Sequence, residues 1–254
     1  MSESVPPPLT DSARQPSSGC AENELEVELS GRQFKLQNGD LLHAVGKLSF
    51  ALPANSFTCI LGPSGCGKTT TLRMILGLDN QFEGRIGLPG DGPVAAVFQE
   101  PRLLPWRTVE QNVRLVLPDS RVDESIDALF EELGLTELRD FYPNQLSLGL
   151  ARRAALARAF VLEPQLLVLD EPFVSLDEAT AIRLRKLLLR LWLSRPTTAL
   201  MVTHNAEEAA LLSDRILLFG ERPASIVKRI DIDTPRDQRN ARFVADIVRQ
   251  LEAF

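Results

Sequence analysis

The chain has 254 residues, of which 44% are hydrophobic and 24% are charged, and its formal net charge at pH 7 is −6. This composition is typical of a globular protein and excludes fibrous and disordered chains. The length suits one large domain with a subdomain. The acidic balance also argues against nucleic acid as a partner, because DNA and RNA are bound through clusters of Lys and Arg.

The N-terminal segment, residues 1 to about 24, is rich in Pro, Ser and acidic residues. Such a segment buries little apolar surface, so we expect a flexible tail and folded structure from about Leu25 onward. It contains no basic stretch followed by an apolar one, as a secretory signal would. We therefore expect a protein that stays in the cytoplasm.

From Leu25 onward, short apolar runs alternate with longer helical patterns. The runs have the length of buried strands and comprise Ser56–Leu61, Val94–Phe98, Leu166–Leu169, Ala199–Thr203 and Ile216–Phe219. Helices are predicted at Thr69–Leu78, Ala151–Phe160, Ala179–Trp192, Ala206–Leu212 and about 237–251, with a helix-rich segment over about 100–160. Strands separated by helices predict an α/β fold with a mostly parallel sheet over residues 25–254 and a helical subdomain at about 100–160.

Cysteines and long apolar segments add little to this prediction. Cys20, Cys59 and Cys66 are odd in number and lack the spacing of a zinc site, so we expect neither disulfides nor a metal cluster. The uncharged window Leu48–Gly67 is interrupted by prolines and glycines, so we do not expect it to cross a membrane.

The most specific motif follows the first of the predicted apolar strands. It reads Gly62, Pro63, Ser64, Gly65, Cys66, Gly67, Lys68 and Thr69, which matches the phosphate-binding pattern G-x-x-x-x-G-K-[ST]. A strand before it and a helix after it would aim backbone N–H groups at phosphate. Lys68 is expected to pair with the β- and γ-phosphates and the Thr69 hydroxyl to hold Mg²⁺, with Thr70 as a further nucleotide contact. The alternative is a glycine-rich turn without a ligand.

Cys66 lies inside this loop, near the N-terminus of the predicted helix. A thiol in that position can have a lowered pKa and react as a thiolate, so we expect labelling that nucleotide slows. The alternative is a small side chain that only fills space. Cys59, inside the preceding strand, is expected to react little.

Two carboxylates end a second apolar strand, at Asp170 and Glu171. Ligands in α/β sheets bind beyond the carboxyl ends of the strands, so Asp170 is expected in the Mg²⁺ shell and Glu171 beside the attacking water. Alternatively, the two acids only cap the next helix. His204 and Gln99 each follow another strand; we interpret His204 as a γ-phosphate contact and Gln99 as a contact of the metal or water, although each is alternatively structural.

These elements, in this order, resemble the ATP-binding cassette (ABC) family over roughly Leu25 to the C-terminus. The matching motifs are Walker A at Gly62–Thr69, the Q-loop at Gln99, the signature at Leu146–Leu150, Walker B at Leu166–Glu171, the D-loop at Ser175–Asp177 and the H-loop at His204. By this resemblance, Phe34 corresponds to the aromatic residue that stacks on adenine. An aromatic residue in a first strand is alternatively part of the core.

The resemblance implies an ATPase that binds ATP and Mg²⁺ and forms a head-to-tail homodimer around two ATP molecules. It implies transmembrane permease partners and, indirectly, a periplasmic or extracellular substrate-binding protein, with the cassette on the inner face of the plasma membrane. The groove near Gln99 and the Leu103–Arg107 segment would receive a permease helix; the alternative is that Pro105 and Trp106 are ordinary packing residues. The stretch Val97–Trp106 together with Pro235–Asp237 is similar to nitrate, sulfonate and taurine importers. The sequence does not name the substrate, because a cassette does not touch it.

The signature departs from the family's Leu-Ser-Gly-Gly-Gln, with Leu148 at the first glycine and Leu150 at the last position. By resemblance, Ser147 and Gly149 contact the γ-phosphate held by the opposite subunit, and both residues remain. The alternative is that the segment only starts a helix. The nearby Arg152, Arg153 and Arg158 are expected to be solvated or ion-paired rather than catalytic.

Two other functions stay open at this point. The altered signature fits a nucleotide-binding regulatory subunit that no longer hydrolyses ATP, although Glu171 and His204 argue against it. An ABC ATPase outside transport, acting on DNA or ribosomes, would normally carry a long coiled-coil insert or a second cassette, and the sequence contains neither.

Overall fold

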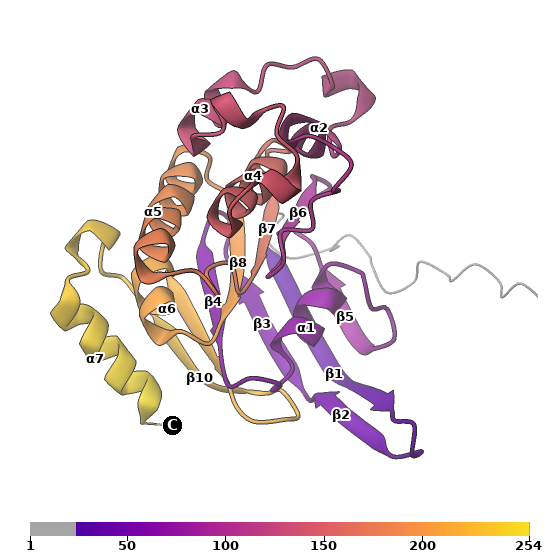
Figure 1. The fold of residues 1–254 in the computed structure, drawn as a ribbon. Coiled ribbons are helices and arrows are strands. Elements are labelled where there is room, and N and C mark those ends of the chain that lie inside the picture. The colour runs from indigo at the N-terminus through magenta and orange to yellow at the C-terminus, as the bar shows by residue number, and fades with distance from the viewer. Residues whose placement is uncertain (1–23, 254) are drawn as a thin grey trace, which may run out of the picture.

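The structure is a computed structural model that describes residues 24–253. Apart from Glu24, the predicted tail lies outside the described residues. Figure 1 shows a central sheet with helices packed on it and a second sheet beside it. Strand β1 begins at Leu25. No helix within residues 24–253 is both long and apolar enough to cross a membrane.

The larger sheet has the order β10-β9-β4-β8-β7-β6. Its strands are β4 (Phe57–Leu61), β6 (Val94–Val97), β7 (Leu166–Asp170), β8 (Thr198–Thr203), β9 (Arg215–Phe219) and β10 (Ile226–Asp231). All neighbours are parallel except β9 and β10. The mostly parallel α/β sheet predicted from the sequence is therefore confirmed, with its five predicted strands placed to within one residue.

A smaller antiparallel sheet packs beside the larger one and was not predicted beyond a first strand. It contains β1 (Leu25–Lys35), β2 (Leu41–Val45), β3 (Leu48–Leu52) and β5 (Glu83–Gly87). The long β1 pairs with β3 and β5 along its first half and with β2 along its second half. Leu25, Val27 and Leu29 are buried on one face, whereas the intervening Glu28 is exposed. This alternation is the pattern of a sheet with one covered face.

Seven helices complete the described part of the chain. They are α1 (Lys68–Ile75), α2 (Val109–Arg114), α3 (Asp127–Leu133), α4 (Leu148–Phe160), α5 (Glu178–Ser194), α6 (Ala206–Leu212) and α7 (Ala241–Glu252). Helix α1 ends before Leu78 because Gly77 adopts φ 67°. Helix α7 begins after Asn240, whose side chain accepts the Phe243 N–H, rather than near residue 237. Between β6 and β7 the chain forms only helices and short 3-10 turns.

The central strands are buried on both faces, because alternate residues enter two different cores. On one face Phe57 and Leu61 of β4 pack with helices α4, α5 and α6. On the other face Ile60 of β4 packs with α1 and the antiparallel sheet. Every residue of β4, β7 and β8 is buried. This explains why these strands appear in the sequence as continuous apolar runs.

The loop before α2 is held by one buried side chain, that of Asn112. Its Oδ1 accepts the Leu104 N–H at 2.7 Å. Its Nδ2 donates to the carbonyls of Leu104, Arg107 and Thr108 at 3.1, 3.0 and 2.9 Å. Asn112 therefore fixes residues 104–108, which follow the Q-loop, against the helix.

We predict that Asn112→Ala lowers the free energy of unfolding by about 2–3 kcal/mol, because it leaves buried backbone groups without partners. Urea unfolding followed by circular dichroism measures the change. Asn80→Ala, at an exposed position, is the matched control and should change stability little. Equal effects of the two substitutions would contradict the role given to Asn112.

Candidate nucleotide-binding site

The phosphate loop connects β4 to α1, as the sequence predicts. Gly67 precedes the helix with φ 116°, a conformation that favours glycine. A Cβ atom there would lie 2.5 Å from the Ala44 carbonyl oxygen and 2.9 Å from Cβ of Ala224. Glycine is thus required at this position both by its backbone conformation and by the close approach of two other segments.

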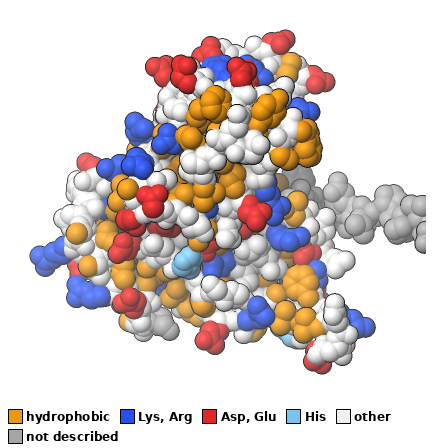
Figure 2. Space-filling model, viewed as in Figure 1, with side chains coloured by type: hydrophobic (Ala, Val, Ile, Leu, Met, Phe, Trp, Pro, Cys, Tyr) orange, Lys and Arg blue, Asp and Glu red, His pale blue; other side chains and the backbone are white. Residues whose placement is uncertain are grey.

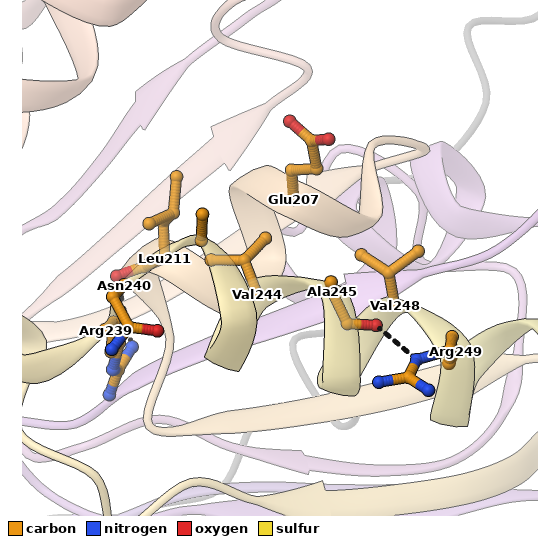
Figure 3. Close-up of a pocket in the computed structure, with 9 residues that line it drawn as sticks. Glu207, Leu211, Arg239, Asn240, Val244, Ala245, Val248 and Arg249 are labelled. Carbon is orange, nitrogen blue, oxygen red and sulfur yellow. Dashed lines mark hydrogen bonds between the residues drawn. The ribbon is translucent and has the colours of Figure 1, made fainter.

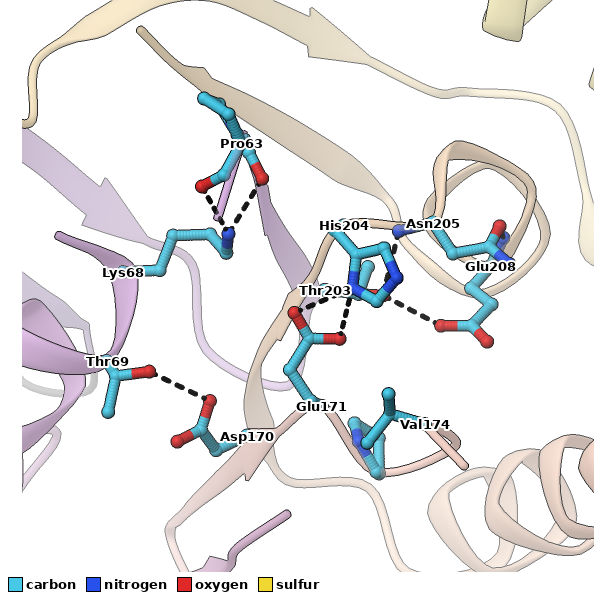
Figure 4. Close-up of polar contacts among 12 residues, drawn as sticks. Pro63, Lys68, Thr69, Asp170, Glu171, Val174, Thr203, His204, Asn205 and Glu208 are labelled. Carbon is cyan, nitrogen blue, oxygen red and sulfur yellow. Dashed lines mark hydrogen bonds and ion pairs between the residues drawn. The ribbon is translucent and has the colours of Figure 1, made fainter. Parts of the chain in front are cut away.

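Lys68, the first residue of α1, has its side chain folded into the loop. It is 6% exposed, and its Nζ donates to the carbonyl oxygens of Gly62 at 2.7 Å and Pro63 at 2.9 Å. Figure 4 shows both contacts. The loop therefore holds the ammonium group close to the position that phosphate would take, and the two carbonyls keep it satisfied.

The Cys66 thiol is buried, contrary to the expected reactive position. Its side chain is 2% exposed and belongs to the core that includes Phe219. Cys66 can offer a ligand only its backbone N–H, and its sulfur fills space beneath the loop. Cys59 is buried as predicted, and burial raises the pKa of its thiol well above the ordinary value.

The carboxylate of Asp170, the last residue of β7, faces Thr69. Thr69 Oγ1 and Asp170 Oδ1 are 3.4 Å apart, so a hydroxyl and a carboxylate converge at the start of α1 (Figure 4). Asp170 is 8% exposed. Burial, and then the neighbouring charge of Glu171, raise the pKa of Asp170.

Glu171 and His204 are brought together by the order of the strands. Strand β8 lies between β4 and β7, and His204 follows it directly. His204 Nδ1 lies 3.0 and 2.9 Å from the two carboxylate oxygens of Glu171 (Figure 4). Glu171 has φ 48°, a sparsely populated conformation for a residue with a side chain, which fits a positioned functional group.

The acidic pair does not cap the next helix, which was the alternative for Asp170 and Glu171. Asp177 is the N-cap of α5, and its side chain accepts the Thr180 N–H at 2.9 Å. Asp170 and Glu171 are therefore free of that role.

Three arginines of α4 donate to backbone carbonyls, and the expectation of a solvated or ion-paired side chain is wrong for the buried Arg152. Arg152 is buried and donates to the carbonyls of Glu171 at 3.3 Å, of Val174 at 2.5 Å, and of Pro172. Its guanidinium thus holds the loop that follows β7. The other two act elsewhere: Arg153 donates to the Leu133 carbonyl, and Arg158 donates to those of Pro101 and Arg102.

One pocket gathers most of the predicted site. It is lined by Phe34, Leu42, Ala44, Ser64, Gly65, Gly67, Lys68, Thr69, Thr70, Gln99, Glu171 and Arg222. Phe34 is half-buried, with the Arg32 guanidinium 4.1 Å from its ring centroid. Gln99 is exposed and also lines the adjoining pocket that contains Asp170. The structure therefore unites Phe34, the phosphate loop, Gln99 and Glu171.

The signature residues do not line this pocket. Ser147 is the N-cap of α4, which begins at Leu148 rather than at Ala151, and its hydroxyl accepts the Leu150 N–H at 3.4 Å. The segment therefore starts α4, and the contact of Ser147 and Gly149 with a partner's nucleotide stays a prediction. A Cβ atom on Gly149 would lie 2.9 Å from Thr180 Cγ2, so this glycine allows α4 to pack against α5. Leu148 is 41% exposed.

A separate groove lies between α6 and α7 (Figure 3). Leu211, Val244 and Val248 are among its lining residues. Arg239, at its end, donates to the carbonyls of Ala210, Leu211 and Ser213, and burial lowers its pKa to about 10. Its contacts join the two elements, and none of the predicted site residues lines this groove.

The sequence reasoning missed Leu42, Ala44 and Arg222 of the pocket. They lie in β2 and in the loop between β9 and β10, which carry no motif. Only the antiparallel pairing of β1 with β2 brings Leu42 opposite Phe34.

A phosphate loop, a buried Asp and a Glu–His pair at one edge of a parallel sheet define a P-loop ATPase core. Residues 45–174 match the ABC transporter family model, so the chain belongs to that family as an ATP-binding subunit. It is 39% identical to aliphatic sulfonates import ATP-binding protein SsuB 1 of Pseudomonas syringae pv. syringae, over 91% of this chain and 97% of that protein.

Other similar proteins agree with this assignment. SsuB 2 of Burkholderia cenocepacia is 36% identical over 94% of this chain and 90% of its own length. An uncharacterized ABC transporter ATP-binding protein of Methanocaldococcus jannaschii is 38% identical over 87% of both chains. A bacterial ABC transporter cassette solved as a dimer has the same fold, with a TM-score of 0.72 and 23% identity over 83% of this chain and 100% of that chain.

We predict that Asp170→Asn stabilises the ligand-free protein while abolishing ATP turnover. The raised pKa means that folding disfavours the ionised form, so this destabilising contribution is absent below the ordinary Asp pKa and grows as pH rises from there through the folded-state pKa. Removing about 1 kcal/mol of it would raise Tm by about 2–4 °C at this chain length.

Thermal unfolding at pH 7 measures this shift. The matched control is Asp177→Asn, because hydrogen bonds from Thr180 lower the pKa of the exposed Asp177 and Asn also caps helices well. A Tm that falls in the Asp170 variant would contradict the electrostatic assignment.

Proposed function

We propose that this chain hydrolyses Mg²⁺-ATP as the ATPase subunit of an ABC importer. The convergence of Lys68, Thr69, Asp170 and the Glu171–His204 pair at one edge of the sheet carries this proposal. ATP would lie in the pocket between Phe34 and the phosphate loop, with the adenine against the Phe34 ring and the phosphates at the N-terminus of α1.

The donor atoms near Asp170 fit a magnesium ion. Thr69 contributes a hydroxyl, Asp170 a carboxylate and Gln99 an amide oxygen, which are the hard oxygen ligands that Mg²⁺ prefers. A bound Mg²⁺ would neutralise charge on the β- and γ-phosphates. The buried, raised-pKa Asp170 would then be held ionised by the cation, which offsets its burial.

The protein's own groups would divide the chemistry among them. Lys68 would exchange its two loop carbonyls for phosphate oxygens. Glu171 would orient the attacking water and accept its proton. His204, whose Nδ1 lies within hydrogen-bond distance of both carboxylate oxygens, would fix the orientation of Glu171 and contact the γ-phosphate.

A second copy of the chain would complete the site. Ser147 and Gly149 do not line the pocket of their own chain. In a head-to-tail homodimer, the N-terminus of α4 would face the γ-phosphate bound by the partner, where its N–H groups and dipole favour an anion. ATP would then hold the two copies together, and hydrolysis would release them.

A transmembrane permease would dock beside the Q-loop and hold the chain at the inner face of the plasma membrane. Trp106 is 71% exposed, and half of the large exposed hydrophobic side chains lie between β6 and β7. Figure 2 shows hydrophobic side chains gathered over this helical segment. Exposed apolar surface of this kind favours contact with another protein. Trp106 lies in the Leu103–Arg107 segment, which Asn112 holds in place.

The transported substrate would be a small anion of the sulfonate type. This step relies on the similarity to proteins named for aliphatic sulfonate import, at 36–42% identity. A separate substrate-binding protein would deliver the anion to the permease. Transport of labelled alkanesulfonates by the assembled system tests the substrate class.

Glu171→Gln tests the hydrolytic step. We predict that turnover falls by about a hundredfold or more, since the amide cannot accept the proton of water, while ATP binding persists. The variant should accumulate as an ATP-dependent dimer in size-exclusion chromatography with light scattering. Lys68→Ala is the control that loses both binding and turnover. A monomer under saturating ATP would argue for a regulatory subunit without hydrolysis.

The signature generates a separate prediction for the assembled transporter. Ser147→Ala removes a hydrogen bond to a charged acceptor, worth about 1.5–3 kcal/mol, so closure should weaken about ten- to a hundredfold. Gly149→Asp should be more harmful, because its carboxylate repels phosphate and its side chain meets Thr180. Ser49→Ala, exposed on β3, is the control for the ATPase rates. Wild-type rates in both signature variants would contradict the dimeric site.

A further inference from the structure

Arg222 approaches the phosphate loop from the loop between β9 and β10. Its Nε and Nη2 donate to the Gly65 carbonyl oxygen at 3.0 and 2.6 Å. The side chain is exposed and lines the same pocket as Phe34 and Lys68. An arginine far from the phosphate loop in sequence therefore forms part of the wall of the candidate nucleotide site.

Backbone hydrogen bonds close to Arg222 hold the loop that carries it beside the pocket. The Ala224 N–H donates to the Ala44 carbonyl at 3.1 Å, and the Gly46 N–H donates to the Ala224 carbonyl at 2.9 Å. Ala224 is fully buried against Gly67. Ala224, two residues after Arg222, is thus held by two hydrogen bonds to the β2 segment and by its contact with the phosphate loop.

Charge distinguishes Arg222 from the rest of the pocket wall. Among the lining residues only Lys68 and Arg222 are cations, and Glu171 is an anion. Lys68 is enclosed by the phosphate loop, whereas Arg222 is exposed to the pocket. Within residues 24–253 no carboxylate forms an ion pair with Arg222, and its Nη1 donates to no acceptor of the protein. A guanidinium with free donors beside a phosphate loop suits a phosphate ligand.

We propose that Arg222 is a nucleotide-binding residue that contacts the polyphosphate of ATP while it holds Gly65. This inference rests on the proposed binding of ATP in this pocket. The Gly65 contact uses Nε and Nη2, which leaves Nη1–H groups for a phosphate oxygen. Arg222 would thereby add a second positive charge to that of Lys68 and secure the loop around the ligand.

The test separates the charge of Arg222 from its bond to Gly65. Arg222→Gln retains an N–H donor for the carbonyl but loses the charge, and Arg222→Lys retains the charge but loses the planar fork. Arg229→Ala removes one positive charge from β10, outside the pocket, where Arg229 pairs with Asp231. Dissociation constants for ATP, ADP and AMP with Mg²⁺ are measured by calorimetry or by competition with a fluorescent ATP analogue, at low and high salt.

We expect Arg222→Gln to weaken ATP binding about tenfold, the size of one charge-assisted hydrogen bond. The loss should be smaller for AMP, which lacks the polyphosphate, and the salt dependence of ATP binding should decrease. Arg222→Lys should recover part of the affinity, and Arg229→Ala should match the wild type. All variants should keep the thermal stability of the wild type, because both arginines are exposed.

Two outcomes would overturn the inference alone. Wild-type affinity for ATP in Arg222→Gln would show that no phosphate contact exists. Equal losses for ATP, ADP and AMP would show that Arg222 acts only through the shape of the loop. A wild-type protein that does not bind ATP would instead overturn the proposed function, and this inference with it.

Discussion

Burial of the parallel sheet on both faces is the constraint on which the rest of the structure depends. Strands β4, β7 and β8 enter a helical core on one side and the core of the antiparallel sheet on the other. Because these strands are parallel, their carboxyl ends meet at one edge, where polar side chains leave the core and can reach a ligand. The phosphate loop, Asp170 and His204 follow from that single geometric condition.

The order of the strands then decides which side chains meet. Strand β8 separates β4 from β7 and brings His204 within hydrogen-bond distance of Glu171. Strand β6, on the other side of β7, places Gln99 beside Asp170 in the adjoining pocket. Residues separated by more than a hundred positions thereby form one site, and no local feature of the sequence specifies that neighbourhood.

Sequence patterns predicted the parts of the fold that depend on the spacing of apolar residues and on the glycines and prolines between them. The five apolar strands and the phosphate loop were predicted because two-sided burial leaves continuous apolar runs and the glycines are spaced for one turn. The antiparallel sheet was not, since its strands bury only one face and need partners distant in sequence. The predicted start of α4, at Ala151, was three residues too late. Leu148 and Leu150 depart from the family signature, and the N-cap role of Ser147 was not recognised from the sequence.

Long-range polar contacts limit how much of the candidate site can be predicted from the sequence. Arg222 and Arg152 act on carbonyls far away in sequence, where residue type and spacing carry no signal. The Cys66 thiol was expected to face the ligand because a motif specifies the backbone of the loop and says nothing about the core beneath it. Burial of that sulfur is decided by Phe219 and its neighbours, which belong to another strand.

Arg152 has a consequence for how two such sites influence one another. It belongs to α4, whose first residues face outward, yet its guanidinium holds the carbonyls of Glu171, Pro172 and Val174. Helix α4 and the loop that carries the carboxylate are therefore tied together by these hydrogen bonds. In the proposed homodimer, contact of a partner's nucleotide with the start of α4 would act on Glu171 of the chain's own site through these hydrogen bonds. Such a link would couple the occupancy of the two sites, which is the physical basis of cooperativity.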